Sequence, residues 1–486
     1  MSPRYALVIG LGVALAGSAS AQVPPPAHQG TPLPPAKPAA SGAPRTLAEA
    51  LAATYSNQPA LQAERAKLRA TDENVPTALA GWRPTVVMAG TAGYGDGLSR
   101  AYSSTLQDWQ KLPTDRDIAT AQATVTQPIY NGGRTQANVN RAKDQVMAER
   151  ANLLAQEQTS FTNTVNAYVG VIQAQDLLTL NINNEQVLQK QLDATNDRFR
   201  VGEITRTDVA QAEAALAGAT AQRQTAEGNL ATARATFVQI VGFYPPADLV
   251  EPQPLALPIR AENDAAAMAA ANNPNVISAQ FNDSAAKDAV DVAFSQLLPQ
   301  LSLQGQAFQE QNSGGRSSDI NGYQVVAQLS VPIYQGGSEY AAVRQAKQTE
   351  QQSARLVADA QRTAVQSAVN AWETLAAATA AAASTRSQIR ANSVALEGVE
   401  REAIVGSRTT LDVLNAQQAL LNSRVTLVQN LAQLVTASYG VAAAIGRLTA
   451  HDLHLAVPLY DETAYYNAVK NKWVGLGDYA TGQPGR

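Results

Sequence analysis

The sequence predicts a mixed α and β membrane protein built from an internal twofold repeat, with four strands per chain leading into very long helices. First, VGEITRTDVAQAEAAL at 201–216 and VGSRTTLDVLNAQQAL at 405–420 align with a constant offset of 204 residues, which indicates a duplicated structural unit. Second, 134–200 and 338–404 contain no proline, as a continuous helix requires. Third, several segments of about ten residues alternate between polar and apolar side chains, which is the pattern of strands with two different faces.

Composition narrows the class of protein. Charged residues make up 16% and aromatic residues 5% of the chain, a mix that suits long helices with wetted faces better than a compact core. The net charge of −4 argues against a nucleic-acid partner, because proteins that bind nucleic acids usually carry a stripe of basic residues. The chain has no cysteine, so disulfides, thiolate metal sites and a lipid-anchored N-terminal cysteine are excluded.

The N-terminus is expected to be an export signal followed by a tether. Residues 1–21 combine Arg4, an apolar run from Tyr5 to Ala16 and a small-residue cleavage site ending at Ala21, as in a signal peptide. The apolar run is too short for a membrane anchor. Residues 22–45 are rich in proline and are expected to be extended. No later stretch has the apolar length of a spanning helix, so a membrane location would have to depend on strands.

The first repeat is expected to span 46–260 and the second 261–450, followed by a C-terminal segment at 451–486. Each repeat begins with a helical segment that proline interrupts, and these prolines, Pro59 and Pro274, are 215 residues apart. The offset therefore changes from 204 to 215, so the first repeat carries 11 extra residues after this segment. Such a difference indicates a loop that tolerates insertion.

Two strand hairpins are expected next, at 85–128 and 300–332, joined by polar loops. The four strands are expected at 85–94, 117–128, 300–308 and 323–332. Strands of about ten residues with one apolar and one polar face are typical of outer-membrane barrels. The alternative is a soluble domain of two sheets, which four strands are too few to form.

Each hairpin is followed by a twin motif, QPIYNGG at 127–133 and VPIYQGG at 331–337. Proline is expected to end the strand and the two glycines to turn the chain into a helix. The expected strand–helix joints comprise Pro128, Gly132, Gly133, Pro332, Gly336 and Gly337. The alternative, a phosphate-binding loop, is disfavoured because the motif lacks a third glycine and a lysine at the right spacing.

The long helices are expected at 134–200 and 338–404, each about 100 Å long at about 1.5 Å per residue. Shorter helices return at 205–240 and 409–445, and the proline-broken segments supply the remaining length beside each long helix. A heptad-like seam, typical of a coiled coil, runs through Val139, Val146, Leu153, Phe161, Val165, Tyr168 and Ile172. A cytosolic coiled-coil scaffold would share these helices, but the signal peptide and the strand hairpins argue against it.

The turns between the helices form two tips, at 201–208 and 405–412. The pairs Val201-Gly202 and Val405-Gly406 are expected to end the long helices. Thr409 or Thr410 can cap the second return helix, which places Asp412 in its first turn. These tip turns are the candidate functional elements of the chain.

Nothing in the sequence indicates an enzyme, a metal site or a cofactor. His28 lies in the tether, and His451 and His454 form an HxxH pair without the glutamate of a zinc protease; all three are expected on the surface. Four strands cannot close a barrel. Two chains would give eight strands around a filled interior, whereas three would give twelve strands and a bore about 24 Å across the backbone.

Several motifs resemble the TolC family of outer-membrane export channels. VGSRTTLDVLNAQ resembles the helix-tip signature of that family, the two joint motifs resemble its strand-to-helix connections, and YDETAYYNAVKNKWVGL at 460–476 is similar to its closing segment in homologues associated with type I secretion. The resemblance covers residues 46 to about 476. It implies a homotrimer with a twelve-stranded barrel in the outer membrane lipid, which continues into a periplasmic coiled-coil barrel of twelve helices. It also implies a periplasmic adaptor (membrane fusion) protein, an inner-membrane pump of ABC or RND type, and tips that close the tube by tightening and open it by untwisting.

The resemblance also assigns roles at the tips. Arg408 matches the gating arginine of the family, and Thr207 and Asp208 match its partners on the neighbouring tip. Asp412 matches a carboxylate that three subunits present as a ring at the constriction. An arginine–carboxylate pair is a suitable latch because the forked guanidinium fixes geometry as well as charge, and converging carboxylates attract cations. The alternative role of Asp208 and Asp412 is to stabilise helix N-termini.

The chain departs from the family pattern at three positions. Asn415 replaces a second constriction carboxylate, so the ring at that level would be neutral. Ala403 stands where the best-known members carry a tyrosine of the gating network, and Asp197 replaces the glutamine partner of that tyrosine. The closed state would therefore depend more heavily on Arg408.

Three functions are compatible with the sequence. The favoured one is an export duct without catalytic chemistry, for proteins or small toxic compounds. The second is a periplasm-spanning structural or adhesin-like trimer that does not conduct. The third is a soluble helical binding module.

Overall fold

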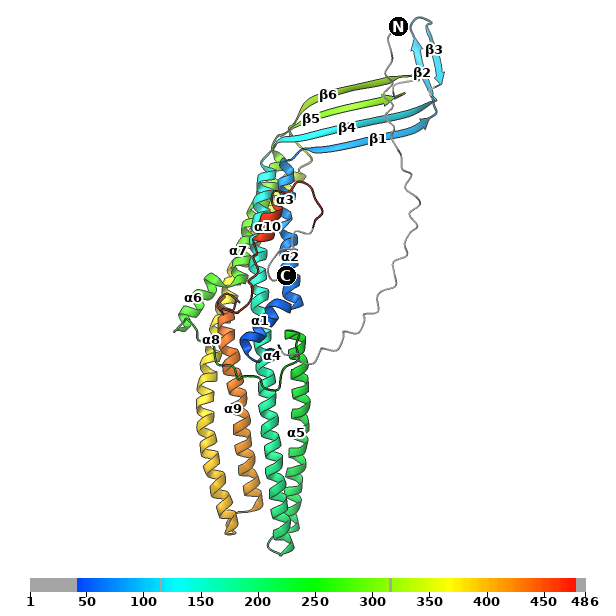
Figure 1. Ribbon diagram of the computed structural model, residues 1–486. Coiled ribbons are helices and arrows are strands. Elements are labelled where there is room, and N and C mark those ends of the chain that lie inside the picture. The colour runs from blue at the N-terminus through cyan, green and yellow to red at the C-terminus, as the bar shows by residue number, and fades with distance from the viewer. Residues whose placement is uncertain (1–41, 114, 314–316, 478–486) are drawn as a thin grey trace.

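The computed structural model describes residues 42–113, 115–313 and 317–477. The predicted signal peptide, most of the predicted tether with His28, and residues 478–486 lie outside the described residues. A four-stranded sheet stands at one end of a long helical assembly, and the two helix tips lie at the opposite end (Figure 1). Among the described residues, no helix combines the length and the apolarity needed to cross a membrane.

The two longest helices, α4 (Arg134–Arg200) and α8 (Ser338–Ile404), contain 67 residues each. Their bounds are the ranges that the sequence indicates. The return helices α5 (Arg206–Val241) and α9 (Thr410–Ala444) begin one residue later than expected, because the preceding threonine is the N-cap and lies outside the helix. Helix α5 packs along α4, and α9 packs along α8.

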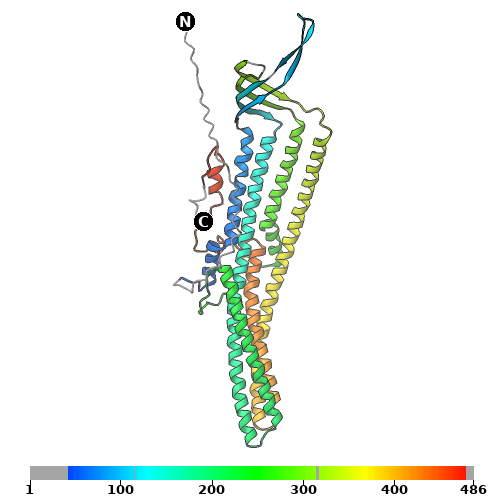
Figure 2. The same cartoon turned by 90° about the vertical axis from the view of Figure 1, so that its right-hand side faces the viewer.

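Shorter helices cover the sheet-proximal halves of α4 and α8. They are α1 (Leu47–Asn57), α2 (Pro59–Asp72), α3 (Asn74–Leu79), α6 (Glu262–Asn272) and α7 (Pro274–Phe294), followed by single turns η1 (Ala80–Trp82) and η2 (Ser295–Leu297). Pro59 and Pro274 each occupy the first helical position, where a missing N–H costs nothing. Helix α7 packs against both α4 and α8, and Figure 2 shows the three side by side.

The sheet contains β1 (Thr85–Gly95), β4 (Arg116–Asn131), β5 (Gln300–Gln311) and β6 (Asp319–Ser330), all antiparallel in the order β1-β4-β5-β6. The expectation that Pro128 ends its strand is wrong. Strand β4 continues to Asn131 through a bulge between Pro128 and Tyr130, a place where a ladder can accept proline because pairing is already interrupted. Strand β6 ends two residues before Pro332.

The stretch between β1 and β4 was expected to be a polar loop, and this expectation is wrong. It forms a separate two-stranded ribbon of β2 (Leu98–Ser103) and β3 (Asp108–Pro113). Tyr102 and Trp109 are paired across it, edge to face with ring centroids 5.7 Å apart, a contact that stabilises such pairs. The described residues therefore contain six strands, and the expected four account only for the main sheet.

The main core lies where α1 and α2 cover α4. Five of the seven seam residues of α4 are buried in this core, and Ile172 is half-buried against it. Val139 is buried as well, but outside this core. Arg65 of α2 is 2% exposed, and its guanidinium carbon lies 4.5 Å from the ring centroid of Tyr55 and 5.1 Å from that of Tyr460. These cation–π contacts compensate for burying the charge. Tyr460 belongs to the C-terminal segment, so this segment helps to close the core.

Candidate functional site

The turn from α4 to α5 forms the first tip. Val201 is the C-cap of α4, and Gly202 adopts a φ of 83°, the left-handed conformation that lets a helix end sharply. The N–H of Gly202 donates to the carbonyl of Phe199 at 3.0 Å, and the N–H of Glu203 donates to that of Arg198 at 3.0 Å. These bonds occupy carbonyls that the helix end would leave unpaired.

The turn from α8 to α9 repeats this geometry at the second tip. Val405 is the C-cap, and Gly406 has a φ of 80°. The N–H of Gly406 donates to the carbonyl of Ala403 at 3.2 Å, and the N–H of Ser407 donates to that of Glu402 at 3.0 Å. All four tip-turn residues expected from the sequence thus lie at the helix ends.

Each return helix begins with a capping box. Thr205 and Asp208 bond each other reciprocally at α5, and Thr409 and Asp412 do the same at α9. The Oδ2 of Asp412 accepts from the backbone N–H and the hydroxyl of Thr409, both at 2.9 Å. The backbone bond from Thr409, followed by its hydroxyl bond, lowers the pKa of Asp412; at Asp208, the hydroxyl of Thr205 is the largest cause of a lowered pKa. Both carboxylates therefore stay charged to an unusually low pH.

Each tip also carries an ion pair across its turn, with opposite polarity. At the first tip, the Nε of Arg198, on the helix, lies 3.0 Å from the Oε2 of Glu203 in the turn. At the second, the carboxylate of Glu402 is on the helix, and its Oε2 lies 2.9 Å from the Nε of Arg408 in the turn. The second tip therefore presents its cation at the extremity, whereas the first presents its carboxylate.

Within one chain, Arg408 bonds Glu402 of its own tip, and Asp208 bonds Thr205. A bond between the tip of one chain and that of its neighbour lies beyond a single chain, so the latch of Arg408 with Thr207 and Asp208 stays a prediction. The Nε bond to Glu402 uses one of the five guanidinium donors. The other donors of Arg408 can address a second carboxylate.

The positions that depart from the family pattern are also placed. The carboxylate of Asp197 accepts from Arg200 at 3.0 Å, and Ala403 contributes its carbonyl to the turn. Asn415 lies one turn beyond Asp412 on α9 and is exposed. The ring role of Asp412 and Asn415 requires neighbouring chains and stays a prediction.

The strand–helix joints depend on glycine at the expected positions. Gly132, Gly133, Gly336 and Gly337 have φ values of 66°, 79°, 72° and 85°, which L side chains rarely adopt. At Gly132 there is also no room for a side chain, because a Cβ atom would lie 2.6 Å from the carbonyl oxygen of Ser295. The joint of the first half is therefore packed against η2.

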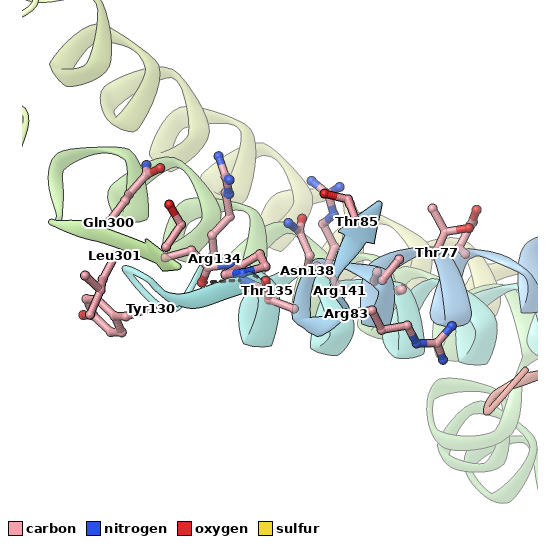
Figure 3. Close-up of a pocket in the computed structure, with 18 of the residues that line it drawn as sticks. Thr77, Arg83, Thr85, Tyr130, Arg134, Thr135, Asn138, Arg141, Gln300 and Leu301 are labelled. Carbon is pink, nitrogen blue, oxygen red and sulfur yellow. Dashed lines mark hydrogen bonds between the residues drawn. The ribbon is translucent and has the colours of Figure 1, made fainter. Parts of the chain in front are cut away.

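A cavity of about 730 Å³ lies at this joint, between the start of α4, α3 and the sheet (Figure 3). Arg134, Asn138 and Arg141 line it from one face of α4, while Arg83 reaches away from Arg134. The side-chain amide of Asn131 donates to the hydroxyl of Thr135 across the turn. The first strand–helix joint is thus lined by polar and charged side chains where the sheet connects to the helices.

Among the described residues, no group of three or more histidine, cysteine, aspartate or glutamate side chains is placed to hold a metal ion. His451 and His454 are both exposed. Glu402, Glu203 and Arg198 were not singled out from the sequence. The available signal for these ion pairs was a pair of opposite charges five or six residues apart across a glycine turn. The spacing rules for helices consider only side chains three or four residues apart, so they do not detect such pairs.

Comparison with known proteins identifies the family. The family model of the outer membrane efflux protein matches residues 50–243 and 265–447. The chain is similar to the outer membrane efflux protein BepC of Brucella suis, with 38% identity over 89% of this chain and 92% of that protein, and to the outer membrane protein TolC of Escherichia coli, with 27% identity over 74% and 75%. Its fold is similar to that of the CmeC outer membrane channel of Campylobacter jejuni, with a TM-score of 0.72 and 15% identity over 83% of this chain and 86% of CmeC.

These relatives are channel and transport proteins rather than enzymes. The likeness extends over both helical halves and the sheet, so it does not depend on one motif. The chain therefore belongs to the outer membrane efflux protein family, the family of TolC, and is an efflux channel protein of the outer membrane.

Proposed function

We propose that three copies of this chain form a continuous export duct, with a twelve-stranded barrel in the outer membrane and a helical tube in the periplasm that is gated at the tips. The observation that carries this proposal is the open sheet. In the described part of the chain, β1 and β6 each pair on one side only. Open edges invite pairing with another chain, and three sheets of four strands close a ring whose bore is about 24 Å across the backbone.

The two faces of the sheet support a barrel with lipid outside and water inside. Met88 is 83% exposed and Tyr323 is 87% exposed, and both lie on one face with Val86 and Val325. The opposite face carries a row of glutamines, in which Gln324 donates to Gln306 at 2.6 Å and Gln306 donates to Gln122 at 2.9 Å. An apolar outer face with a polar interior is the arrangement of outer-membrane barrels.

The tips support a gate and a docking point for other proteins. Ile404, Val405 and Val201 are exposed apolar residues at the extremity of the helices. Exposed apolar residues grouped in this way favour contact with another protein. We assign to this contact a periplasmic adaptor that links the duct to an inner-membrane pump of ABC or RND type. The cargo would be proteins or small toxic compounds.

The division into two repeats, 46–260 and 261–450, is part of this proposal. Each half supplies a long helix, a return helix and two strands of the sheet. Three chains would therefore place six similar units around the tube axis. Because Arg408 and Asp208 lie on different tips, the gate would form between unlike halves.

The proposal is tested by purifying the full chain in detergent, determining its mass and then recording conductance in planar bilayers. A mass of three chains with discrete conductance steps is the expected result. A three-chain species without conductance would instead support the structural trimer, and a monomer that needs no detergent would support the soluble binding module.

A further inference from the structure

The C-terminal segment exposes three apolar side chains close to the sheet. Trp473 is 66% exposed, Val474 is 87% exposed, and Leu476 is fully exposed; we call these three residues the tail patch. They follow helix α10 (Ala464–Val469), which packs against α2 in the part of the helical assembly nearest the sheet (Figure 1). Large apolar side chains grouped on a surface in this way mark a contact site.

The tail patch is held at the boundary between helices and sheet. Arg83, which lies between η1 and β1, donates from Nη1 to the carbonyl of Lys472 at 2.6 Å. The guanidinium carbon of Arg83 lies 4.8 Å from the ring centroid of Trp473. Thr85, two residues later, begins the strand whose exposed apolar side chains include Val86. The indole is therefore fixed at the level where the apolar face of the sheet begins.

The rest of the segment is anchored to the helices. The hydroxyl of Tyr465 donates to Glu73 at 2.8 Å, and the N–H of Tyr460 donates to the hydroxyl of Tyr55 at 3.0 Å. These contacts attach the segment to α1 and to the end of α2. The position of the tail patch is therefore set by the contacts of Tyr460, Tyr465 and Arg83 with their neighbours.

The residues that immediately surround the tail patch favour a phospholipid surface. Residues 464–477 contain two lysines, Lys470 and Lys472, and no acidic residue, and Arg83 adds a third cation. Tryptophan is enriched at membrane–water interfaces because its ring is apolar and its N–H is polar. Basic residues beside such a ring attract anionic headgroups. A protein partner would not require the patch to lie at the edge of the membrane-facing sheet.

We propose that the tail patch inserts into the periplasmic leaflet of the outer membrane, with Lys470, Lys472 and Arg83 binding the phosphates of anionic phospholipids. This inference rests on the proposed barrel, because the barrel sets the level of the membrane. The C-terminal segment is then a lipid-binding collar that fixes the depth of the helical tube relative to the bilayer. Three chains would provide three such contacts around the barrel.

The test uses Trp473 as the reporter in the full chain. Trp82, Trp109 and Trp372 are the only other tryptophans and are replaced by phenylalanine, and the protein is reconstituted into phosphatidylglycerol vesicles with or without brominated acyl chains. Trp473 fluorescence is expected to fall about twofold with bromine near the headgroups and less with deep bromine, as for an interfacial indole. A companion protein lacks all four natural tryptophans and carries Met88→Trp on the outer face of the sheet.

The companion separates the two proposals. If Trp at position 88 is quenched by deep bromine while Trp473 is not, the barrel stands and the lipid contact of the tail is overturned. Iodide quenching of Trp473 would then show a tail in water, and protection from both quenchers would show a tail covered by a neighbouring subunit. Absence of quenching at position 88 would overturn the barrel, and with it this inference.

A charge variant tests the headgroup contact. Lys470→Gln is expected to reduce the difference in Trp473 quenching between phosphatidylglycerol and phosphatidylcholine vesicles. Lys190→Gln, which removes the same charge from the distant part of α4, is expected to leave that difference unchanged. Equal effects of the two variants would overturn the role of Lys470.

Discussion

Arg408 lies in the turn between α8 and α9, where Glu402 holds its Nε at 2.9 Å. The hydrogen bond from Arg408 to Glu402 is the largest cause of the raised pKa of the guanidinium, so the group is permanently charged. Glu402 thus holds the side chain of Arg408 within the turn of the second tip. A fixed guanidinium is better suited to a latch than a free one, because less conformational freedom is lost when it binds.

Arg408→Ala is expected to raise single-channel conductance in planar bilayers, because the gate loses the cation that joins neighbouring tips. Glu402→Gln is expected to raise it less, since Arg408 remains but is held less firmly. Arg200→Ala is the matched control, because Arg200 is an exposed arginine of the first tip that pairs with Asp197. Unchanged conductance in Arg408→Ala would remove the latch assignment.

Asp412→Ala is expected to weaken block by multivalent cations applied from the periplasmic side. This substitution also removes a capping box, which costs about 1 kcal/mol, so Asp412→Asn is the better variant because it removes the charge and keeps a capping oxygen. Asn415→Asp should strengthen the block by adding a second carboxylate ring. Block that is equal in all of these proteins would contradict a ring at this level.

At the residue scale, the sequence predicted the tip turns and the place of Asp208 and Asp412 in the first helical turns, but not their capping boxes or the ion pairs. The glycines and threonines of the tips are local signals, because helix ends have strong residue preferences. The pairs Arg198–Glu203 and Arg408–Glu402 depend on how the turn folds back, which spacing alone does not reveal. The same limit applies to Arg65, whose burial depends on Tyr460 nearly four hundred residues away.

At the scale of elements, the two strand–helix joints differ although their motifs match. Gly132→Ala would place its Cβ 2.6 Å from the carbonyl of Ser295, whereas nothing lies within 4 Å of a Cβ at Gly336. Both substitutions incur the strain of a positive φ, about 1–2 kcal/mol, and Gly132→Ala adds a clash of about 1–3 kcal/mol.

Thermal unfolding followed by circular dichroism measures this difference, with the Tm of Gly132→Ala expected below that of Gly336→Ala. Equal Tm values would mean that η2 moves aside and that the first joint is not packed as described. Gly133→Ala is a further control, because it shares the positive φ without a close neighbour.

The core between α2, α4 and the C-terminal segment holds two buried carboxyls. Burial raises the pKa of Glu157 from 4.5 to about 7, and burial likewise raises that of Asp72 from 3.8 to about 7. The folded state therefore binds protons more tightly than the unfolded state between about pH 4 and pH 7. Stability from these groups is complete at the acidic end of this window and falls as the pH rises through it.

The Tm is accordingly expected to be higher at pH 5 than at pH 8. In Glu157→Gln the difference should shrink, because glutamine is neutral and still accepts from the N–H of Ala450. A pH dependence that is the same in this variant and in the natural protein would contradict a raised pKa at Glu157.

Elements were predicted best where their pattern was long. Both α4 and α8 could be located from the sequence, because each is a stretch of 67 residues without proline. The strand end expected at Pro128 was wrong, because a bulge accommodates this proline inside β4. The β2–β3 ribbon was missed because its strands span six residues each and lie in a polar stretch, where alternation is too short to be recognised.

At the scale of the whole molecule, the single chain is an incomplete object. In the described part of the chain, β1 and β6 each pair on one side only, and apolar side chains on one face of the sheet are exposed. In the proposed assembly, the helices of one chain would supply only part of the tube wall. Assembly of three chains would pair the edges and place the glutamine row inside. The sequence could predict this assembly only from the number of strands per chain, because closure of a barrel depends on the whole sheet and not on any single residue.

The proposed assembly is three chains that enclose one conducting duct. The most direct test is single-channel recording in planar bilayers of a preparation whose mass has been established as three chains. Discrete conductance steps are expected from this species. A pure three-chain species that inserts into the bilayer and produces no conductance steps, both in its natural form and as Arg408→Ala, would contradict the proposed duct.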